Sequence, residues 1–342
     1  MTRSLFLVLF LLPATLFAQI YADGDQHGAV VQPRLAFTTT GAAFAWNFRG
    51  IHVAMDVTHG PVYAENQILL AGSGDNPAIA SDGENALVVW NSGVGRPRRP
   101  QLLAALAGRG GVIARFDIAE CDADTAPAAR WNGTSYVVAW RVQGALRATV
   151  VDRFGNFLGE IHDVADAAPG YRVSIATDGD RSLVVTKDAF VVVDRDAHPI
   201  AQSAGGGHGV AWDGSEYFVV DADAVGVIGT RVSRDGAPLG APARITSDAG
   251  HDPRVAWNGR DLEVLWLVDR ALPFRPSVRL GRVGGDGIGE EIWSDRWIDA
   301  DNFDLAARPA GQTIVARGPA AALVVGVISF DIRMPPRRHT AA

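Results

Sequence analysis

The sequence contains one cysteine, Cys121, so no disulfide can form within the chain and a cysteine-rich metal site is excluded. It has no surplus of positive charge either, because 31 Lys and Arg stand against 38 Asp and Glu, for a net charge of -7. Nucleic-acid-binding proteins normally carry a basic surplus, so we exclude that class. No apolar run after residue 18 is long enough to span a membrane as a helix.

Common functional motifs are also absent. There is no Gly-x-Ser-x-Gly elbow, no His-Glu-x-x-His, no P-loop and no pair of histidines at a metal-binding spacing. We therefore predict no cofactor, no metal site and no catalytic residue from a motif. No useful window shows helical periodicity free of Gly and Pro, which predicts an all-β protein.

The N-terminus has the pattern of a signal peptide. Arg3 precedes an apolar run that ends in small residues near Ala18. We expect cleavage near Gln19 and export to the periplasm or the outside of the cell. The remaining chain is predicted to be one domain over residues 19–334 with a disordered tail at 335–342, and we expect a monomer. Apolar residues make up 48% of the sequence, enough for a large core in which Cys121 is a packing residue.

One pattern recurs along the chain. Its clearest copies begin at Pro77, Pro127 and Pro253, which we term lead residues; a Gly follows six residues later and a Trp seven residues after that Gly. Weaker copies at the same spacing have the lead residues Pro33, Val173, His208 and Leu305. The seven copies begin 35 to 52 residues apart, a period that suits four short strands per unit.

Each unit reads as a four-stranded antiparallel sheet. The lead residue begins a strand, and Asn-Gly or Asp-Gly then marks a tight turn in which both central residues favour positive φ. Seven such sheets predict a seven-bladed β-propeller. The last unit has room for three strands before the tail, so we predict that an N-terminal strand, within Gln19–Ala22 or Ala29–Val31, closes the last blade.

The pattern from lead residue to Trp resembles the repeat of uncharacterised secreted bacterial seven-bladed β-propeller proteins. The clearest carriers of this resemblance are Pro127-Ala-Ala-Arg-Trp-Asn-Gly133 and Tyr136-Val-Val-Ala-Trp140. It covers nearly the whole chain after residue 18 and implies the fold. Since such propellers include binding modules, scaffolds and enzymes, it implies no particular function.

Four arginines interrupt an otherwise uniform part of the repeat. One and three residues after each lead residue, on the side of the strand expected to face the axis, the occupants are Ala, Gly or Ser in most units. The exceptions are Arg34, Arg130, Arg254 and Arg308. A guanidinium group suits bidentate capture of a carboxylate, sulfate or phosphate, so these residues are candidates for ligand binding near the axis.

Polar residues lie at the entry to the same strands and complete the candidate site. They are Asp75, Tyr171, His208, His251, Asp252 and Asp301. Two interpretations stay open. The aspartates either pair with the arginines and cap the channel without a ligand, or they line a binding site with them.

Two functional hypotheses follow. The first is an exported, noncatalytic recognition or scaffold module that binds an anionic small molecule or an acidic glycan at the channel mouth; a protein partner is left open. The alternative is a glycan-active hydrolase or lyase that draws its acid and base from Asp75, Asp252, Asp301, His208 and Tyr171. A hydrolase requires two carboxyl groups roughly 5 to 10 Å apart across the ligand.

Overall fold

The computed structural model describes residues 17–21, 31–47, 50–57, 67–93, 99–158, 160–167, 172–247, 249–268, 277–283, 291–295, 303–308, 312–317 and 329–333. Within these ranges the chain forms strands β1 to β28 and no helix, which confirms the all-β prediction. Consequently none of the described residues belongs to a helix that could cross a membrane. Most of the predicted leader and the predicted tail at 335–342 lie outside the described residues.

The strands occupy four positions, from the axis of the molecule outward. The innermost strands are β2 (Val31–Phe37), β6 (Asp75–Ser81), β10 (Ala128–Trp131), β14 (Ser174–Thr177), β18 (Gly209–Trp212), β22 (Gly250–Trp257) and β26 (Phe303–Arg308). The second strands are β3 (Ala42–Asn47), β7 (Ala86–Asn91), β11 (Ser135–Val142), β15 (Ser182–Val185), β19 (Tyr217–Ala222), β23 (Leu262–Val268) and β27 (Gln312–Arg317). The third strands are β4 (Ile51–Val57), β8 (Gln101–Gly108), β12 (Ala145–Asp152), β16 (Ala189–Val193), β20 (Val227–Val232), β24 (Ser277–Val283) and β28 (Ser329–Arg333). The outermost strands are β5 (Gln67–Ala71), β9 (Gly111–Glu120), β13 (His162–Asp166), β17 (Pro199–Ala204), β21 (Ala243–Arg244), β25 (Glu291–Asp295) and β1 (Phe17–Tyr21).

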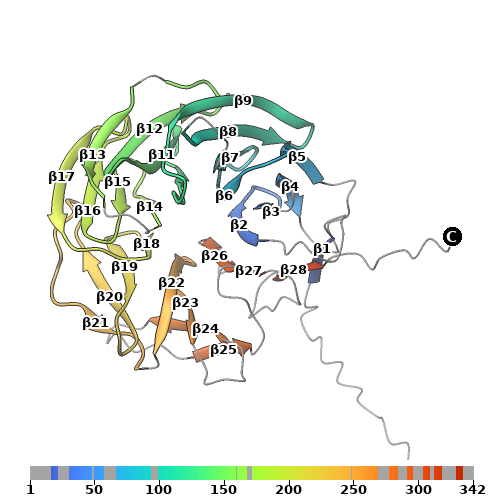
Figure 1. Ribbon diagram of the computed structural model, residues 1–342. Helices are drawn as coiled ribbons and strands as arrows, with labels where there is room; N and C mark the ends of the chain where they lie inside the picture. The colour runs from blue at the N-terminus through green and yellow to red at the C-terminus, as the bar shows by residue number, and fades with distance from the viewer. Residues whose placement is uncertain are drawn as a thin grey trace, which may run out of the picture.

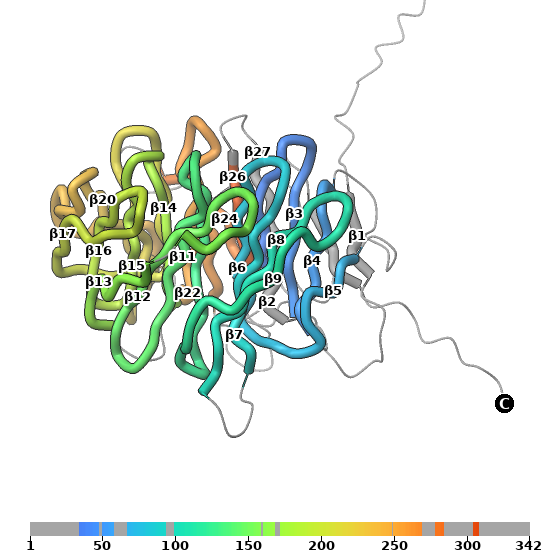
Figure 2. The backbone as a smooth tube through the Cα atoms, turned by 90° about the horizontal axis from the view of Figure 1, so that it is seen from above, coloured from blue at the N-terminus to red at the C-terminus, as the bar shows by residue number. Residues whose placement is uncertain are grey.

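These strands form seven four-stranded sheets, which we term blades. Blade 1 consists of β2–β5, and the numbering follows the chain to blade 7, which consists of β26–β28 and β1. Each innermost strand contacts the innermost strand of the next blade, and β26 contacts β2, so the ring is closed. Figure 1 shows the ring along its axis and Figure 2 shows it from the side. The chain is therefore a seven-bladed β-propeller, in which radial repetition leaves few exposed sheet edges.

The seventh blade is closed by the N-terminus, but its strands are not all antiparallel. β1 pairs with β28 in parallel over Phe17–Tyr21, and β28 also pairs in parallel with β27. The prediction of four antiparallel strands is correct for blades 1 to 6 and wrong for blade 7. The chain between Arg317 and Ser329 is longer than a hairpin turn, and a parallel neighbour requires such a longer connection. Of the two segments predicted to close the ring, the one near Gln19 does so.

In blades 1 to 6, whose first turns are described, a side chain accepts a hydrogen bond from the backbone of the turn after the innermost strand. In blade 3, Gly133 has a φ of 99°, as the Asn-Gly pair predicts. Asn132 does not share this conformation, so the expectation of two central residues with positive φ was wrong. Its Oδ1 accepts hydrogen bonds from the backbone N–H groups of Thr134 (3.0 Å) and Ser135 (2.8 Å) instead. The short polar side chain therefore replaces part of the backbone hydrogen bonding.

The repeated tryptophans lie in the buried clusters between consecutive blades. Trp90, Trp140 and Trp266 are 2%, 0% and 4% exposed. A Cβ on Gly74 would lie 2.5 Å from Cδ1 of Trp90, and one on Gly250 would lie 2.6 Å from Cδ1 of Trp266. Glycine is required at both positions because the backbone approaches the indole ring so closely.

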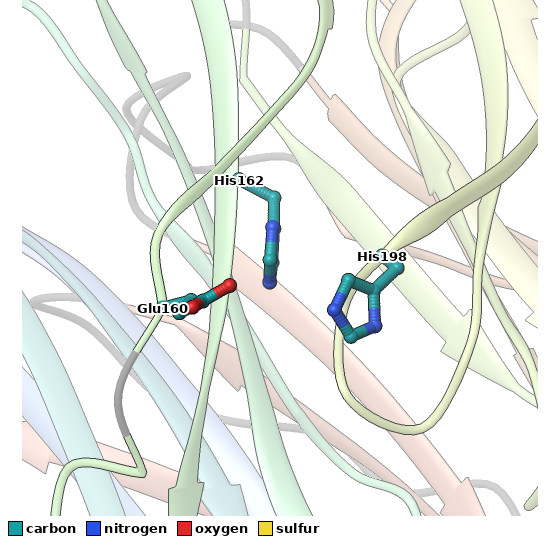
Figure 3. Close-up of side chains that lie close together, drawn as sticks. All are labelled: Glu160, His162 and His198. Atoms are coloured by element: carbon teal, nitrogen blue, oxygen red, sulfur yellow. The ribbon is translucent and has the colours of Figure 1, made fainter.

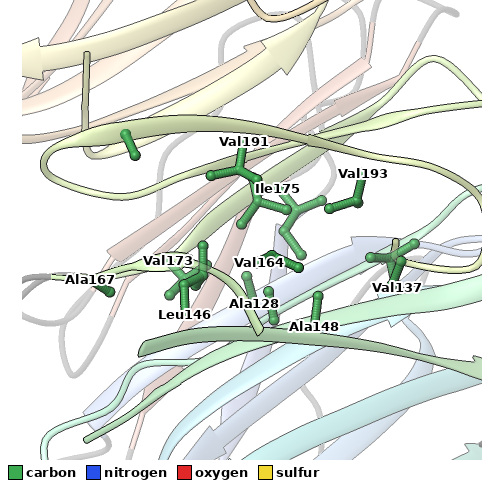
Figure 4. Packing of buried hydrophobic residues seen from close by; sticks show 14 of the residues in the cluster. Ala128, Val137, Leu146, Ala148, Val164, Ala167, Val173, Ile175, Val191 and Val193 are labelled. Carbon is green, nitrogen blue, oxygen red and sulfur yellow. The ribbon is translucent and has the colours of Figure 1, made fainter. Parts of the chain in front are cut away.

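Apolar side chains fill the space between consecutive blades. Between blades 3 and 4 the buried cluster includes Leu146 and Val164 from one sheet and Val191 and Val193 from the other (Figure 4). Ala197, in the turn between β16 and β17, belongs to the same cluster and is fully buried. The outer parts of these two blades are therefore held together by a shared core.

Cys121 lies in the corresponding cluster between blades 2 and 3 and is buried. Burial, with a smaller contribution from the charge of Asp122, raises the pKa of its thiol to about 12. Since the thiolate is the reactive form, this residue packs rather than reacts, as predicted.

Ion pairs join turns of neighbouring blades on one side of the disc. Arg234, after β20, pairs with Asp178 and Asp180 in the first turn of blade 4. Burial would raise the pKa of Asp178, but the hydrogen bond from Arg234 and those from the backbone amides of Arg181 and Asp180 outweigh it and hold the pKa below its ordinary value. The ionised carboxylate therefore stabilises the folded state.

We expect Arg234→Gln to lower the free energy of unfolding by roughly 1 to 2 kcal/mol at pH 7, since a buried carboxylate loses a charged donor. Because the folded-state pKa of Asp178 is depressed, its stabilising effect is complete above the ordinary pKa and is lost as the pH falls through the folded value. The difference between variant and wild type should thus shrink toward pH 2 in urea titrations. Arg147→Gln, which breaks a more exposed pair with Asp163, is the control and should change stability less. An equal effect of Arg234→Gln at both pH values would contradict the assignment.

Candidate functional site

A cavity of about 410 Å³ lies at the axis of the ring and is lined by residues of all seven innermost strands or their entries. Much of its wall consists of small side chains, which follow from the crowding of seven strands around one axis. Those at the repeat positions considered above are Ala78, Ala128, Ser174, Gly209, Ala211, Ala256 and Ala306. The lead-residue strands are therefore the axial strands, as the repeat predicts.

Four arginines line this cavity. Three of them, Arg34, Arg130 and Arg254, were singled out from the sequence. The fourth is Arg172, which precedes β14 and was not. Arg308 is the last residue of β26, and its side chain lies outside the described part of the molecule.

Arg254 is committed to an ion pair with Asp252. Its Nη1 lies 2.6 Å from Oδ1 of Asp252 and its Nη2 lies 3.0 Å from Oδ2, so the pair is bidentate. The Arg254 side chain is 8% exposed and that of Asp252 27%. Burial would raise the pKa of Asp252, but the charges of Arg254 and Arg172 outweigh it and hold the pKa well below its usual range. For this pair the interpretation of mutual charge compensation fits.

Arg172 is in a different position. Burial, followed by the positive charges of Arg254 and Arg34, holds the pKa of its guanidinium well below the usual range. The charges of Asp252 and Asp304 compensate only in part. None of the described residues makes a hydrogen bond or close ion pair with Arg172. Burial and the neighbouring like charges therefore disfavour the charged form of Arg172 in the folded protein.

Arg130, on β10, also lines the cavity and is accessible from it. Its side chain is exposed at the cavity surface, and partial desolvation there lowers the pKa of its guanidinium. Within the described part of the chain it has no hydrogen-bond or ion-pair partner. No neighbouring charge contributes to that shift, so Arg130 does not belong to the electrostatic cluster of Arg34, Arg172 and Arg254.

Among the described residues, Asp304 is the one carboxylate that lines the cavity. Its Oδ2 accepts a hydrogen bond of 3.1 Å from the backbone N–H of Leu35, which joins blade 7 to blade 1. One carboxylate oxygen is thus occupied in closing the ring.

The other predicted residues lie away from the cavity wall or outside the described ranges. Asp75 is exposed and accepts a hydrogen bond of 2.9 Å from the side chain of Asn47. His208 lies 2.6 Å from Asp221 through Nδ1. None of these, nor the half-buried His251 on β22, is a lining residue. Tyr171 and Asp301 fall outside the described residues.

Arg172 was missed for an identifiable reason. It stands one residue before the lead residue Val173, whereas the repeat was compared at one and three residues after it. On a regular strand, alternation would place these three positions on the same side, although a register shift between His251 and Arg254 interrupts it in blade 6. The equivalent residues in blades 6 and 7 are Asp252 and Asp304, so comparing this earlier position would have revealed a second charged layer.

The fold and the cavity define a β-propeller with an arginine-lined axial cavity. No family model matches the chain. No curated protein matches it either.

Solved structures share the fold at low sequence identity. Hydrazine synthase from Kuenenia stuttgartiensis is 11% identical, with a TM-score of 0.53 over 88% of this chain and 100% of that chain. The β-propeller domain of Cps50 (Swd1) from Myceliophteria thermophila is 12% identical, with a TM-score of 0.52 over 84% of this chain and 94% of that one. At these identities the likeness supports the propeller fold alone.

Proposed function

We propose that this protein is a noncatalytic recognition module whose axial cavity binds an anionic small molecule or the acidic group of a glycan. The observation that carries the proposal is the pair Arg130 and Arg172, which line the cavity without a close ionic partner among the described residues. A cavity of about 410 Å³ falls within the range of small-molecule sites.

The electrostatics favour an anion in particular. Burial and like charges disfavour the charged form of Arg172, and an anion beside it would offset both effects. Guanidinium groups bind carboxylates, sulfates and phosphates through two parallel N–H hydrogen bonds. These hydrogen bonds are stronger in a site shielded from water.

The hydrolase or lyase alternative has less support. A glycan hydrolase of the usual kind requires two carboxyl groups that flank the ligand. Asp304 is the one described carboxylate on the cavity wall, and Asp252 is held ionised by Arg254, which does not suit a general acid.

We further propose that the protein is exported and monomeric. The leader-like residues 1–18 support export. Cleavage before Gln19 would remove Phe17 and Ala18 from β1 and leave Gln19–Tyr21 to pair with β28.

The test combines affinity with stability. Isothermal titration calorimetry would compare glucuronic acid, galactose 6-sulfate and inorganic sulfate with uncharged glucose. We expect at least one anion to bind, glucose not to bind, and Arg172→Gln to weaken binding about 10-fold or more. Since burial and the neighbouring like charges disfavour the charged form of Arg172, the same variant should unfold at an equal or higher temperature.

Arg260→Gln is the matched control, because Arg260 is 89% exposed and outside the cavity wall, and the substitution removes the same charge. Equal binding of glucose and the anions, or equal losses in both variants, would overturn the proposal.

A further inference from the structure

Three potential metal ligands meet on the rim of the propeller, apart from the axial cavity. Glu160 precedes β13, His162 begins it, and His198 follows β16 in the next blade. Their ligand atoms all lie within 4.8 Å of one another, and Figure 3 shows His198 opposite the other two side chains. The rings of the two histidines are 4.2 Å apart between centroids.

We propose that Glu160, His162 and His198 form a binding site for a divalent transition-metal ion, with Zn²⁺ as the reference ion, that links blades 3 and 4. Two imidazoles and one carboxylate are a ligand set that zinc commonly takes, with a fourth position left for water or another ligand. The inference is independent of the function proposed for the axial cavity.

The geometry requires a small adjustment. Tetrahedral coordination at zinc distances places the donor atoms about 3.3 Å from one another. Glu160 and His198 are exposed and His162 is half-buried, so the first two side chains are free of core packing and can rotate inward. None of the described Arg or Lys residues forms an ion pair with Glu160 that would hold its carboxylate elsewhere.

The backbones that carry the donors are firmly held. The backbone O of Glu160 accepts a hydrogen bond of 2.9 Å from the Thr149 hydroxyl, and His162 pairs with Ala148 in the sheet. On the other side of the site, Ala197 is buried in the core that joins the two blades. The three donors therefore approach one another through packing that exists without any ion.

Asp194 orients the His198 ring. Its Oδ2 lies 3.2 Å from Nδ1 of His198. If Nδ1 carries the proton and donates it to Asp194, Nε2 keeps its lone pair for a metal. Carboxylates hydrogen-bonded to the far nitrogen of a histidine ligand are a common feature of metal sites and raise the basicity of the ligand.

The turn that carries His198 does not need a histidine. Three turns of five residues are equivalent: Asp152–Asn156, Asp194–His198 and Ser233–Ala237. In each, the backbone N–H of the first residue donates a hydrogen bond to the backbone C=O of the fifth, at 3.0, 2.9 and 2.8 Å. The backbone N–H of the fifth residue donates a hydrogen bond to the side chain of the first residue in each turn. Asn and Ala thus serve at this position in blades 3 and 5, and local structure does not explain His198.

The axial site and the rim site lie on opposite faces of the disc. Arg172 precedes the start of an innermost strand. The turns that carry Glu160 and His198 join third and fourth strands, and in an antiparallel sheet those turns lie at the end where innermost strands finish. An ion at the rim would consequently leave the arginine cluster unobstructed.

The experiment uses untagged protein freed of metal with EDTA. Co²⁺ is titrated while visible d–d absorption is followed, and Zn²⁺ then displaces it. We expect saturable absorption at one Co²⁺ per chain and a Tm increase of about 5 °C at a 100-fold excess of Zn²⁺ over its Kd. His198→Ala, which introduces the residue that the equivalent turn of blade 5 carries, and Glu160→Gln should each weaken binding at least about 10-fold while leaving the metal-free Tm unchanged.

Asp196→Asn is the control, because it removes a negative charge from the same exposed turn without removing a donor. Its affinity should match that of the wild type. Absence of saturable absorption, or equal weakening in Asp196→Asn and His198→Ala, would overturn the site and leave only general attraction of cations to an acidic turn.

Discussion

A chain that begins at Ala29 is expected to unfold about 10 °C below one that begins at Gln19. The longer chain keeps the pairs Gln19↔Asp331, Ile20↔Ile332 and Tyr21↔Arg333, whereas the shorter one has no β1. Both keep β2, which starts at Val31.

The effect should be large because β28 depends on β1. β27 pairs with β28 at two positions, Ala316↔Phe330 and Arg317↔Asp331, while β1 pairs with it at every one of its residues. Without β1 the third strand of blade 7 loses most of its partners, and an antiparallel pair, β26 with β27, remains between blades 6 and 1. Each lost backbone hydrogen bond costs about 1 kcal/mol.

Differential scanning calorimetry of the two chains measures this directly. Removal of residues 335–342 from the other end is the control, and we expect no change in Tm. A synthetic peptide of residues 17–28 added to the shorter chain should restore part of the lost Tm. Equal melting temperatures for the two N-terminal variants would mean that β1 does not close the ring.

Arg254→Ala is expected to lower the free energy of unfolding by about 3 kcal/mol at pH 7. The substitution leaves the Asp252 carboxylate, 27% exposed in the wild type, without its bidentate partner. The charges of Arg172 and His208 also favour the ionised Asp252. The loss of unfolding free energy should therefore lie at the low end of the range for a buried ion pair that loses one partner.

The pH dependence has a definite sign. In the wild type the pKa of Asp252 is held well below its usual range, so its stabilising effect persists to strongly acidic pH. In the variant, loss of the Arg254 charge raises that pKa above its wild-type value, and protonation relieves the unpaired charge as the pH falls. The deficit measured by urea unfolding should therefore be smaller at pH 4 than at pH 7. A deficit that grows on acidification would contradict this account.

Comparison of Arg254→Ala with Arg172→Gln separates the two roles of axial arginines. Both residues line the same cavity, yet Arg254 has a bidentate partner and Arg172 has no close one among the described residues. The first should lose stability, and the second should lose anion binding while keeping its stability.

Local patterns predicted most of the fold. The stretch from Pro77 to Trp90 became β6 and β7 because a short apolar run lies on each side of an Asp-Gly turn, and such runs are buried on both faces as paired strands between neighbouring blades. Repetition of that stretch predicted the number of blades, and the small residues beside each lead residue predicted the axial strands. The parallel strands of blade 7 could not be predicted in this way, because they depend on a long connection and on β1 rather than on a hairpin.

The candidate site was predicted less completely. Arg34, Arg130 and Arg254 stood out as departures from the repeat, and they do line the cavity. Their partners did not stand out. The pairing of Asp252 with Arg254 is local, because the two residues lie two positions apart on β22. The lack of a close partner for Arg172 among the described residues depends instead on how neighbouring blades are rotated and spaced at the axis.

The sequence by itself therefore determined the repeat, the strands within it and the small residues at the axis, since these follow from spacing and alternation within one unit. Tertiary structure alone decided which polar groups of different blades meet. Asp304 reaches Leu35 across the closure of the ring, and Glu160 and His162 face His198 across a blade boundary. Such contacts join residues far apart in the chain, and only the packing of one blade on the next brings them within reach.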